Sequence, residues 1–375
     1  MDLVEFQNKY PQIHTYQDDD EMKIFDLFER SPMNLQGLQL IYDRKPSFSA
    51  LLQAQSHDWL TVVSKDSNRL FGFASMSVTP RYWNGELQNI CYLGDLRAEY
   101  DRSTMKLWRR AYGDLLLMCQ GYFRSRPPQK FLTAILKDNK IAQQSLVRQR
   151  PGKTFAYDYI KSIQMVNILG SFFPVSHHKG IRWARSNEEE SLRSFIETCH
   201  RKMNMGYDYS SSEQSEWNYR KANWPDWSID SFLVMEEEGE IQAVCFPWSP
   251  TALKRMRVEN CSWGMRWLFK ISGLFGCKNP KVGENFTTLY LTHLSFLKTE
   301  LRNENWYGYE FSKFLLKSKA LRKSNLISFC SQTPHKSPSA LLVQKTDVDL
   351  FFVRSAEESK AVFVDDYIDF EMALV

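Results

Sequence analysis

The chain has 375 residues, of which 43% are hydrophobic and 25% are charged, and it is rich in aromatic residues, with 25 Phe, 17 Tyr and 11 Trp. This composition is typical of a folded globular protein and excludes a disordered one. The formal net charge of only +4 gives no concentrated basic surface, so nucleic acid is not expected as a partner. The chain is longer than a single hydrophobic core usually supports, so we predict two domains.

The cysteines and the hydropathy pattern predict a compartment. Seven cysteines occur without a Cys-x-x-Cys pair, which favours reduced, buried thiols over a disulfide framework or a zinc site. His177 and His178 have no further ligand at metal-binding spacing, so no metal is expected. The N-terminal residues lack the pattern of a signal peptide, and no segment has 18 uninterrupted apolar residues. We therefore expect a cytoplasmic protein.

In the first half, strands and helices follow in the order β-α-α-β-β-β-α-β-α-β. The predicted strands are 11–16, 59–65, 69–78, 90–99, 130–138 and 154–170. The predicted helices are 17–32, 47–55, 102–119 and 139–149. This order predicts helices that cover a mostly antiparallel sheet.

The second half repeats much of this order. The predicted strands are 180–186, 231–237, 240–248, 285–297, 326–332, 347–355 and 368–375, and the predicted helices are 187–203, 307–323 and 337–345. Pro174 and Gly180 interrupt the pattern between the halves. We therefore predict an α/β (α+β) fold with two tandem domains, 1–172 and 179–375, each with a mixed, mostly antiparallel sheet flanked by helices.

The strand "CYLGDLRAE", its charged turn and helix, and the later stretch "DNKIAQQSLV" resemble the GNAT acyltransferase superfamily. The resemblance covers nearly the whole chain as two copies and is clearer in the first. It implies acetyl-CoA or another acyl-CoA as co-substrate, with the pyrophosphate held by backbone amides at the helix N-terminus, where the helix dipole favours anions. The cofactor-binding residues that it implies are Leu96, Arg97, Ala98, Arg102, Ser103, Thr104, Met105, Lys106, Leu107 and Asn139.

The phosphate-binding turn departs from the family pattern Arg/Gln-x-x-Gly-x-Gly/Ala. With Arg102 in the leading position, the residues that follow include neither glycine. Ser103 and Thr104 have hydroxyls that can cap the helix or bind a phosphate, whereas Met105 and Leu107 would have to point away from it. Positive charge comes from Arg102, Lys106, Arg109 and Arg110. Phosphate binding and a plain charged helix start are both compatible with this turn.

The resemblance also implies a carboxylate base on the central strands and a tyrosine acid near the next helix. Asp95 and Glu99 are the candidates for the base, although a structural salt bridge of Asp95 with Arg97 or a neighbouring strand is an equal alternative. In the family pattern Asn-x-x-Ala-x-x-x-Tyr, Asn139 and Ala142 match, but Leu146 stands in place of the tyrosine. Tyr157 is the candidate substitute among the tyrosines downstream.

His293 lies on the corresponding strand of the second half, where a neutral imidazole is a candidate base. A hydrogen-bonded core histidine is the alternative. Because the second turn also lacks the phosphate pattern, we expect this copy to shape the acceptor site instead of binding coenzyme A.

An insertion at 251–285 is unexpected for the family. Its helical part, 261–276, has a narrow polar stripe, many apolar residues and flanking Lys and Arg. One interpretation is an interfacial helix that touches anionic lipid or admits an acyl chain. The other is a lid packed on the sheet and buried nearly all round.

Three functional hypotheses follow. The first is an acyl-CoA-dependent N-acyltransferase, an acetyltransferase in the simplest case, acting on a small-molecule or protein amine. The second is a catalytically silent GNAT-like protein that binds a ligand or another protein. Aminoacyl transfer from a charged tRNA is a third, against which the modest net charge argues.

Overall fold

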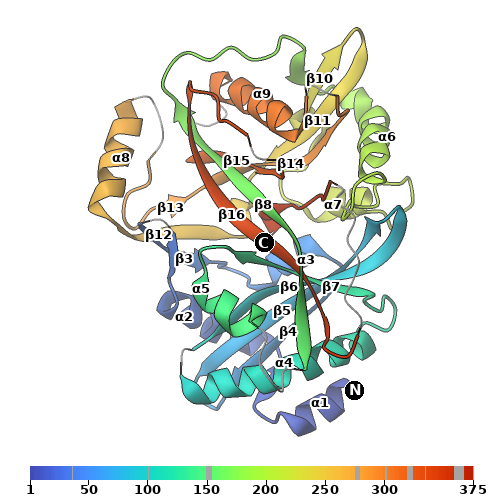
Figure 1. Cartoon of the computed structure of the whole chain (residues 1–375), viewed down its shortest axis with the longest axis vertical. Coiled ribbons are helices and arrows are strands. Elements are labelled where there is room, and N and C mark those ends of the chain that lie inside the picture. The colour runs from blue at the N-terminus through green and yellow to red at the C-terminus, as the bar shows by residue number, and fades with distance from the viewer. Residues whose placement is uncertain are drawn as a thin grey trace.

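The computed structural model describes the chain except residues 36, 100, 149–153, 275–278, 300–301, 319–323, 334, 359–366 and 375. One large twisted sheet runs through the length of the molecule, with helices on its faces (Figure 1). Among the described residues, no helix is both long and apolar enough to cross a membrane.

The first half contains the predicted elements and three more. Its helices are α1 (Leu3–Lys9), α2 (Glu21–Arg30), α3 (Ser49–Gln55), α4 (Arg102–Tyr122) and α5 (Lys140–Ala142), which continues as a π-helical turn to Val147. Its strands are β1 (Ile13–Thr15), β2 (Met33–Leu35), β3 (Leu38–Asp43), β4 (Asp58–Lys65), β5 (Leu70–Trp83), β6 (Glu86–Ala98), β7 (Lys130–Leu136) and β8 (Phe155–Ser171). Helix α1 and strands β2 and β3 were not predicted, although the capping box of Asp2 and Glu5 is a readable start signal for α1.

The second half differs from prediction at its end. Its helices are α6 (Glu189–His200), α7 (Glu216–Asn223), α8 (Trp263–Leu274) and α9 (Glu304–Lys317). Its strands are β9 (Ile181–Trp183), β10 (Leu233–Glu237), β11 (Glu240–Trp248), β12 (Arg255–Cys261), β13 (Asn285–Phe286), β14 (Thr288–Phe296), β15 (Leu326–Ser331) and β16 (Leu341–Ser355). The predicted helix 337–345 is wrong, because residues from Leu341 onward extend the long strand β16. The predicted strand 368–375 is wrong too: Ile368 forms one bridge with Asn204, and Met372–Leu374 form a 3-10 turn.

The large sheet has twelve strands in the order β1-β4-β5-β6-β7-β16-β8-β15-β14-β11-β10-β9. Its strands are antiparallel except for two pairs, β6 with β7 and β14 with β15. The mostly antiparallel sheet flanked by helices confirms the predicted fold class. A parallel pair therefore lies on each side of the centre.

Strands β8 and β16 form the centre of this sheet and tie the two halves together. They pair along almost their whole length, from Leu341↔Ser171 to Ser355↔Phe155. The C-terminal part of β16 also pairs with β7 of the first half, and the C-terminal part of β8 pairs with β15 of the second half. Figure 1 shows the two strands crossing the middle of the molecule. Each half thus supplies a strand to the other, and the division into domains 1–172 and 179–375 stays a prediction.

A second, smaller sheet has the order β13-β12-β3-β2 and joins the insertion to the first half. Strand β12 pairs with β3 from Arg255↔Asp43 to Cys261↔Leu38. Helix α8 follows β12 directly and lies at the edge of the molecule, at the left of Figure 1.

Candidate functional site

The parallel strands β6 and β7 separate soon after they meet. They pair only from Ile90↔Lys130 to Tyr92↔Leu132, although β6 continues to Ala98 and β7 to Leu136. Where they part, the hydroxyl of Thr133 donates a hydrogen bond of 3.0 Å to the carbonyl of Leu93. Beyond Tyr92, no described strand pairs with β6 on this side, so its backbone groups there are open to a ligand.

A β-bulge in β6 lies at the point of separation. The register with β5 shifts between Phe73↔Arg97 and Ser75↔Gly94, and Asp95 has a φ of 53°. Aspartate is among the few residue types that adopt this left-handed conformation without a large penalty. The bulge reorients the end of β6, as bulges next to active sites commonly do.

A cavity of about 180 Å³ opens beside the separated strands. It is bounded by the end of β6, the first turns of α4, the helical segment from α5 onward and the start of β8. The lining residues are Leu96, Ala98, Met105, Trp108, Arg109, Tyr112, Asn139, Ile141, Ala142, Ser145, Leu146 and Phe155. Four residues predicted to bind the cofactor, Leu96, Ala98, Met105 and Asn139, are therefore brought together here. Leu146, which stands where the family has its tyrosine, also lines this cavity.

Alternation along β6 explains why Arg97 is not part of the cavity. Side chains of successive strand residues point to opposite faces, so Leu96 and Ala98 share one face and Arg97 takes the other. The guanidinium of Arg97 donates a hydrogen bond of 2.7 Å to the carbonyl of Ser31. It also lies over the rings of Phe28 and Tyr42, at 4.8 and 5.0 Å from their centroids.

The cavity wall formed by α4 belongs to a fixed core. At helical spacing along α4, Trp108, Tyr112, Leu115 and Cys119 are buried, while Met105 is half-buried. Trp108 donates from its indole nitrogen to the hydroxyl of Ser64 at 3.0 Å. A Cβ at Gly72 would lie 2.6 Å from that indole nitrogen, so only glycine fits between β5 and Trp108.

Tyr157 is buried behind the cavity and does not line it. Its hydroxyl lies 3.2 Å from that of Tyr112, to which it donates, and burial raises the pKa of both tyrosines. Tyr112, like Ser145, is a hydroxyl-bearing residue among those that line the cavity. Neither was predicted as a site residue, because helical spacing does not reveal where a buried face ends beside a cavity.

The start of α4 binds a carboxylate from its own chain. Asp101 is the N-cap, and its Oδ1 accepts hydrogen bonds of 2.9 Å from the backbone N–H groups of Ser103 and Thr104. The hydroxyl of Ser103 also donates to Asp101, and these hydrogen bonds hold the pKa of this carboxyl well below its usual range. The cap was expected to come from Ser103 and Thr104, but Asp101 provides it. Two N–H groups of the expected anion site are therefore already used.

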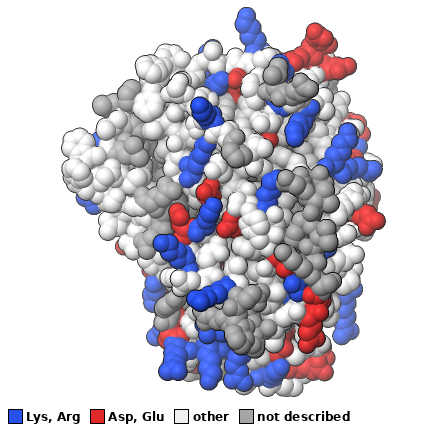
Figure 2. Space-filling model, viewed as in Figure 1, with Lys and Arg blue, Asp and Glu red and all other residues white. Residues whose placement is uncertain are grey.

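Positive charge nevertheless surrounds this helix end. Arg102, Lys106, Arg109 and Arg110 are exposed, whereas Thr104 is buried and Leu107 packs against the core. Figure 2 shows Lys and Arg side chains gathered along the lower edge of the molecule, where α4 lies in Figure 1. Asn139 caps α5 by accepting from the N–H of Ala142 at 3.1 Å.

The two carboxylates predicted as bases are both held by arginines. Asp95 accepts two hydrogen bonds of 2.7 Å from Arg44, whose side chain is only 1% exposed. The structural salt bridge expected as an alternative for Asp95 is thus present, but its partner Arg44 lies directly after β3, whereas Arg97 or a neighbouring strand was expected. Glu99 forms ion pairs with Arg30 and Arg69.

Lys254 belongs to the same cluster and was not predicted. It is 6% exposed, and its Nζ lies 5.9 Å from the ring centroid of Tyr42. Desolvation and the positive charge of Arg44 lower the pKa of Lys254, and the negative charge of Asp95 raises it. Desolvation dominates, so the pKa of Lys254 is lowered to about 7. Arg44 and Lys254 come from segments far from β6 in sequence, so no local sequence motif predicts that they lie near Asp95.

A small hollow of about 30 Å³ lies beside this ion pair. It is lined by Arg44, Leu52, Gln55, Ser75, Ser77, Tyr92, Gly94 and Asp95. Gln55 donates to the carbonyl of Leu374, so the C-terminal segment borders this hollow. The hollow and the larger cavity meet β6 at neighbouring residues.

His293 lies in a different environment from Asp95. It is 1% exposed, its Nε2 is 3.1 Å from Arg220, and burial lowers its pKa well below the usual value. Arg220, fully buried, is ion-paired with Glu216 and Glu371, each at 2.7 Å. His293 is therefore a hydrogen-bonded core residue, which was the alternative interpretation.

The opening between β14 and β15 is filled by the protein itself. These strands pair only from Thr288↔Leu326 to Tyr290↔Ser328. Beyond that point the C-terminal segment enters: the ring of Tyr367 packs on Phe296 at 5.6 Å, and Ile368 donates to Gln332 at 2.9 Å. The space that corresponds to the first cavity is thus occupied by this segment.

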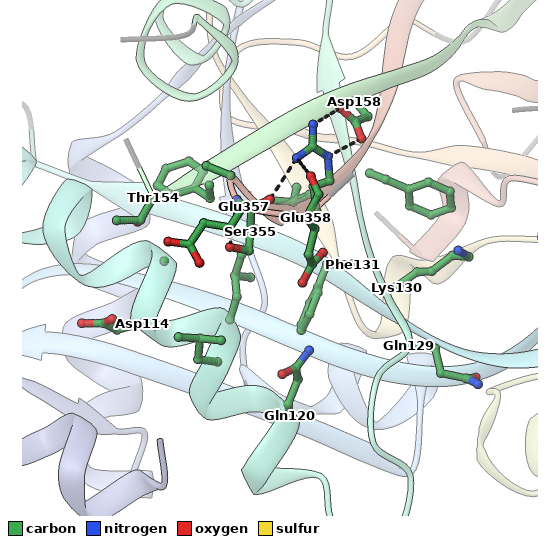
Figure 3. A pocket seen from close by; sticks show the side chains of 18 residues that line it. Asp114, Gln120, Gln129, Lys130, Phe131, Thr154, Asp158, Ser355, Glu357 and Glu358 are labelled. Atoms are coloured by element: carbon green, nitrogen blue, oxygen red, sulfur yellow. Dashed lines mark hydrogen bonds and ion pairs between the residues drawn. The ribbon is translucent and has the colours of Figure 1, made fainter. Parts of the chain in front are cut away.

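A larger cavity, of about 770 Å³, lies at the other end of α4. Figure 3 shows Asp114 and Gln120 on one side of it and Asp158, Ser355 and Glu358 on another. Among its charged groups, Arg354 donates to Asp158 at 2.7 Å and Lys9 lies 2.6 Å from Asp114. This cavity reaches β7 at the end where β7 is still paired with β6.

Among the residues that the structure describes, no group of three or more His, Cys, Asp or Glu side chains is arranged to hold a metal ion. The six described cysteines are free thiols, five of them buried and Cys330 half-buried, and the seventh, Cys277, lies outside the described residues.

Comparison with known proteins rests on structure. No protein-family model matches the sequence, and no curated protein matches it either. A structure of Saccharomyces cerevisiae N-myristoyltransferase with bound myristoyl-CoA is similar at a TM-score of 0.54 and 9% identity, covering 96% of this chain and 87% of that one. Another structure of this enzyme, with bound myristoyl-CoA and inhibitors, is similar at a TM-score of 0.53 and 10% identity. The match covers 96% of this chain and 84% of that one. A tandem GNAT protein from the clavulanic acid biosynthesis pathway gives 0.47 and 9% identity over 92% and 99%.

The likeness to the N-myristoyltransferases extends over nearly the whole of this chain, at an identity that leaves only the fold in common. The same fold was expected from the strand, turn and helix at β6 and α4. The protein therefore shares its fold with these N-myristoyltransferases.

Proposed function

We propose that the protein is an acyl-CoA-dependent N-acyltransferase that uses the cavity between β6, α4 and α5. The separation of β6 from β7 after three residue pairs carries this proposal. It leaves one edge of β6 open beside an apolar cavity. The pantetheine arm of coenzyme A has two amides, which suit such an open strand edge as an added strand does.

The basic end of α4 supports the same placement. The phosphates of coenzyme A need positive charge within reach of the cavity, and Arg109 lines it while Arg102 and Lys106 are exposed one turn away. We place the pyrophosphate over these side chains, with Ala98 and Met105 close to it. The thioester then points along β6 toward the bulge at Asp95.

Acyl transfer to an amine requires an unprotonated nitrogen, donors for the oxyanion and a proton for the leaving thiolate. The bulge supplies backbone N–H groups on the open side of β6, and we assign the oxyanion to them. The amine approaches from the hollow at Asp95, whose ion pair with Arg44 orients it. Tyr112, backed by Tyr157, is our candidate for the proton donor in place of the tyrosine that Leu146 replaces.

Binding and turnover are measured separately to test this function. Acetyl-, octanoyl- and myristoyl-CoA are titrated by calorimetry and by thermal shift, because a ligand that binds only the folded state raises the melting temperature. Release of free coenzyme A is then followed with a thiol reagent against a panel of amines. The acyl chain that binds most tightly identifies the donor. Saturating concentrations of all three without heat or shift would reject the proposal.

The catalytically silent alternative is favoured by two observations, the capping carboxylate of Asp101 and the leucine at position 146. It predicts tight acyl-CoA binding without thiol release for any amine in the panel, including hydroxylamine as a small general acceptor. The restoring variant Leu146→Tyr separates the cases, since it adds the family's hydroxyl inside the cavity. A gain of turnover in this variant indicates that only the acid was lost.

A further inference from the structure

Helix α8 presents an apolar face to solvent. Trp263, Trp267 and Ile271 are 76%, 49% and 46% exposed, and their spacing of four residues places them on one side of the helix. The two indole rings contact each other, with centroids 5.9 Å apart. The interpretation of this helix as a lid buried nearly all round is therefore wrong.

The opposite face fixes α8 to the small sheet. Phe269 is 7% exposed and packs with Leu38, Leu40, Val258 and Cys261. Met265, one turn earlier, packs against the same cluster and lies close to Gly37. The exposed face is thus held outward by a packed core beneath it.

The charge of this segment has one sign. Residues 261–283 contain Arg266, Lys270, Lys278 and Lys281 and no Asp or Glu. Lys270 is exposed and lies over the ring of Trp267, with its Nζ 5.6 Å from the centroid. Figure 2 shows mostly white surface at the left edge, where α8 lies in Figure 1, with no red on it.

From these observations we propose that α8 docks the protein on an anionic lipid bilayer, with Trp263, Trp267 and Ile271 inserted at the level of the headgroups and Arg266 and Lys270 on the lipid phosphates. Exposed tryptophan with Lys and Arg on one helix fits the chemistry of an interfacial helix. The cores of protein–protein interfaces are instead depleted in lysine, which argues against a protein partner on this face. This inference does not rest on the proposed acyl transfer.

Docking through α8 also places the site relative to the bilayer. Strand β12 runs from α8 back to Arg255, which is paired with Asp43 at 3.1 Å, and Arg44 follows and holds Asp95. The membrane face is therefore connected by one strand pair to the hollow where the amine would bind.

The test is flotation of the full-length protein with phosphatidylcholine vesicles, with and without phosphatidylglycerol. We expect binding only to the vesicles that contain phosphatidylglycerol, and weakening as salt is added. Trp267→Glu and Trp263→Glu should each reduce partitioning by about tenfold, because they replace inserted indole by charge. The matched control is Leu87→Glu, at a residue that is 47% exposed on β6, which should bind as the unmodified protein does.

Lys270→Glu measures the contribution of positive charge to vesicle binding. This variant should abolish the preference for phosphatidylglycerol. Equal binding to both vesicle types, or none to either, would overturn the proposal. Sedimentation velocity without lipid tests whether a second copy of the protein covers this face of α8 instead. A dimer that Trp267→Glu dissociates would show that it does, and this result would also overturn the proposal. Because acyl-CoA binding is measured without vesicles, its failure and the failure of docking are independent.

Discussion

Asp95 and His293 adopt the same unusual backbone conformation at the same place in the two halves, with φ values of 53° and 54°. Each lies in a bulge where its strand, β6 or β14, slips in register against the preceding strand. Each of these strands then leads toward a long helix and is paired for three residues with a parallel strand. The two halves thus share this local backbone arrangement, although their sequences differ there.

The two side chains have separate environments. Asp95 keeps 18% of its side chain exposed, whereas the side chain of His293 is fully buried among aromatic rings and Arg220. Each borders a hollow of about 30 Å³. The opening beside β6 also borders a cavity of about 180 Å³, whereas Tyr367 and Ile368 pack at the opening beside β14.

The first prediction concerns the cap of α4. Asp101→Asn keeps an N-cap side chain but removes a negative charge at the expected phosphate position. We expect acyl-CoA to bind about threefold more tightly, with unchanged stability to urea. Because the pKa of Asp101 is held low, the gain should be the same throughout the neutral pH range. Asp2→Asn, at the N-cap of α1, is the control, and equal affinity of all three proteins would place the phosphates elsewhere.

The second prediction concerns the cavity. Ala142→Phe fills it from α5, and we expect at least about a tenfold loss of acyl-CoA affinity by calorimetry, since the pantetheine arm and the ring compete for one space. Gln144→Phe is the matched control, because Gln144 is exposed on the same segment and does not line the cavity. Retained affinity in Ala142→Phe would move the binding site away from this cavity.

The third prediction concerns the ion pair of Arg44 and Asp95. Asp95→Asn leaves the buried guanidinium without its counter-charge, which should lower the free energy of unfolding by about 3 kcal/mol. The double variant Arg44→Met with Asp95→Asn removes both charges, keeps a residue type that tolerates the φ of 53°, and should recover most of that loss in urea denaturation. A loss below about 1 kcal/mol for Asp95→Asn would mean that solvent already screens the pair.

The fourth prediction is a pH dependence from Lys254. Its folded pKa, about 7, is lower than the usual value of 10.5, so between these values the unfolded chain binds the extra proton. The stability of the protein relative to Lys254→Met should therefore rise as pH increases from about 7 to about 10.5 and be lowest below pH 7. Tyr42, whose own pKa is raised by burial, faces the same cluster with Arg44 and Asp95. Urea denaturation at several pH values measures the difference, and a flat difference would show that Lys254 is charged when folded.

Local patterns carried much of the fold. Alternation and helical spacing located β4 to β8 and the buried stripe of α4, because these periods report which face an element buries. They failed at 337–345, where pairing with β8 draws residues from Leu341 onward into a long strand. Propensity over nine residues cannot compete with such pairing.

The site was predicted in part for the same reason. Leu96, Ala98, Met105 and Asn139 were implied by the family resemblance of this strand, turn and helix, and they line one cavity. Asp101 was readable as an N-cap but was not assigned. Arg44 and Lys254 could not be predicted from local sequence, because they come close to Asp95 only when β3 and β12 pair in the second sheet.

By itself, the sequence determined the order of elements, the apolar faces and the family-like strand, turn and helix at β6 and α4. Only the tertiary structure decided that β8 and β16 are shared by both halves, that the second opening is filled and that α8 shows its tryptophans to solvent. The physical reason is that periodicity depends on neighbours a few residues apart. What covers a face, or pairs with a strand edge, is set by residues that the chain brings back from far away.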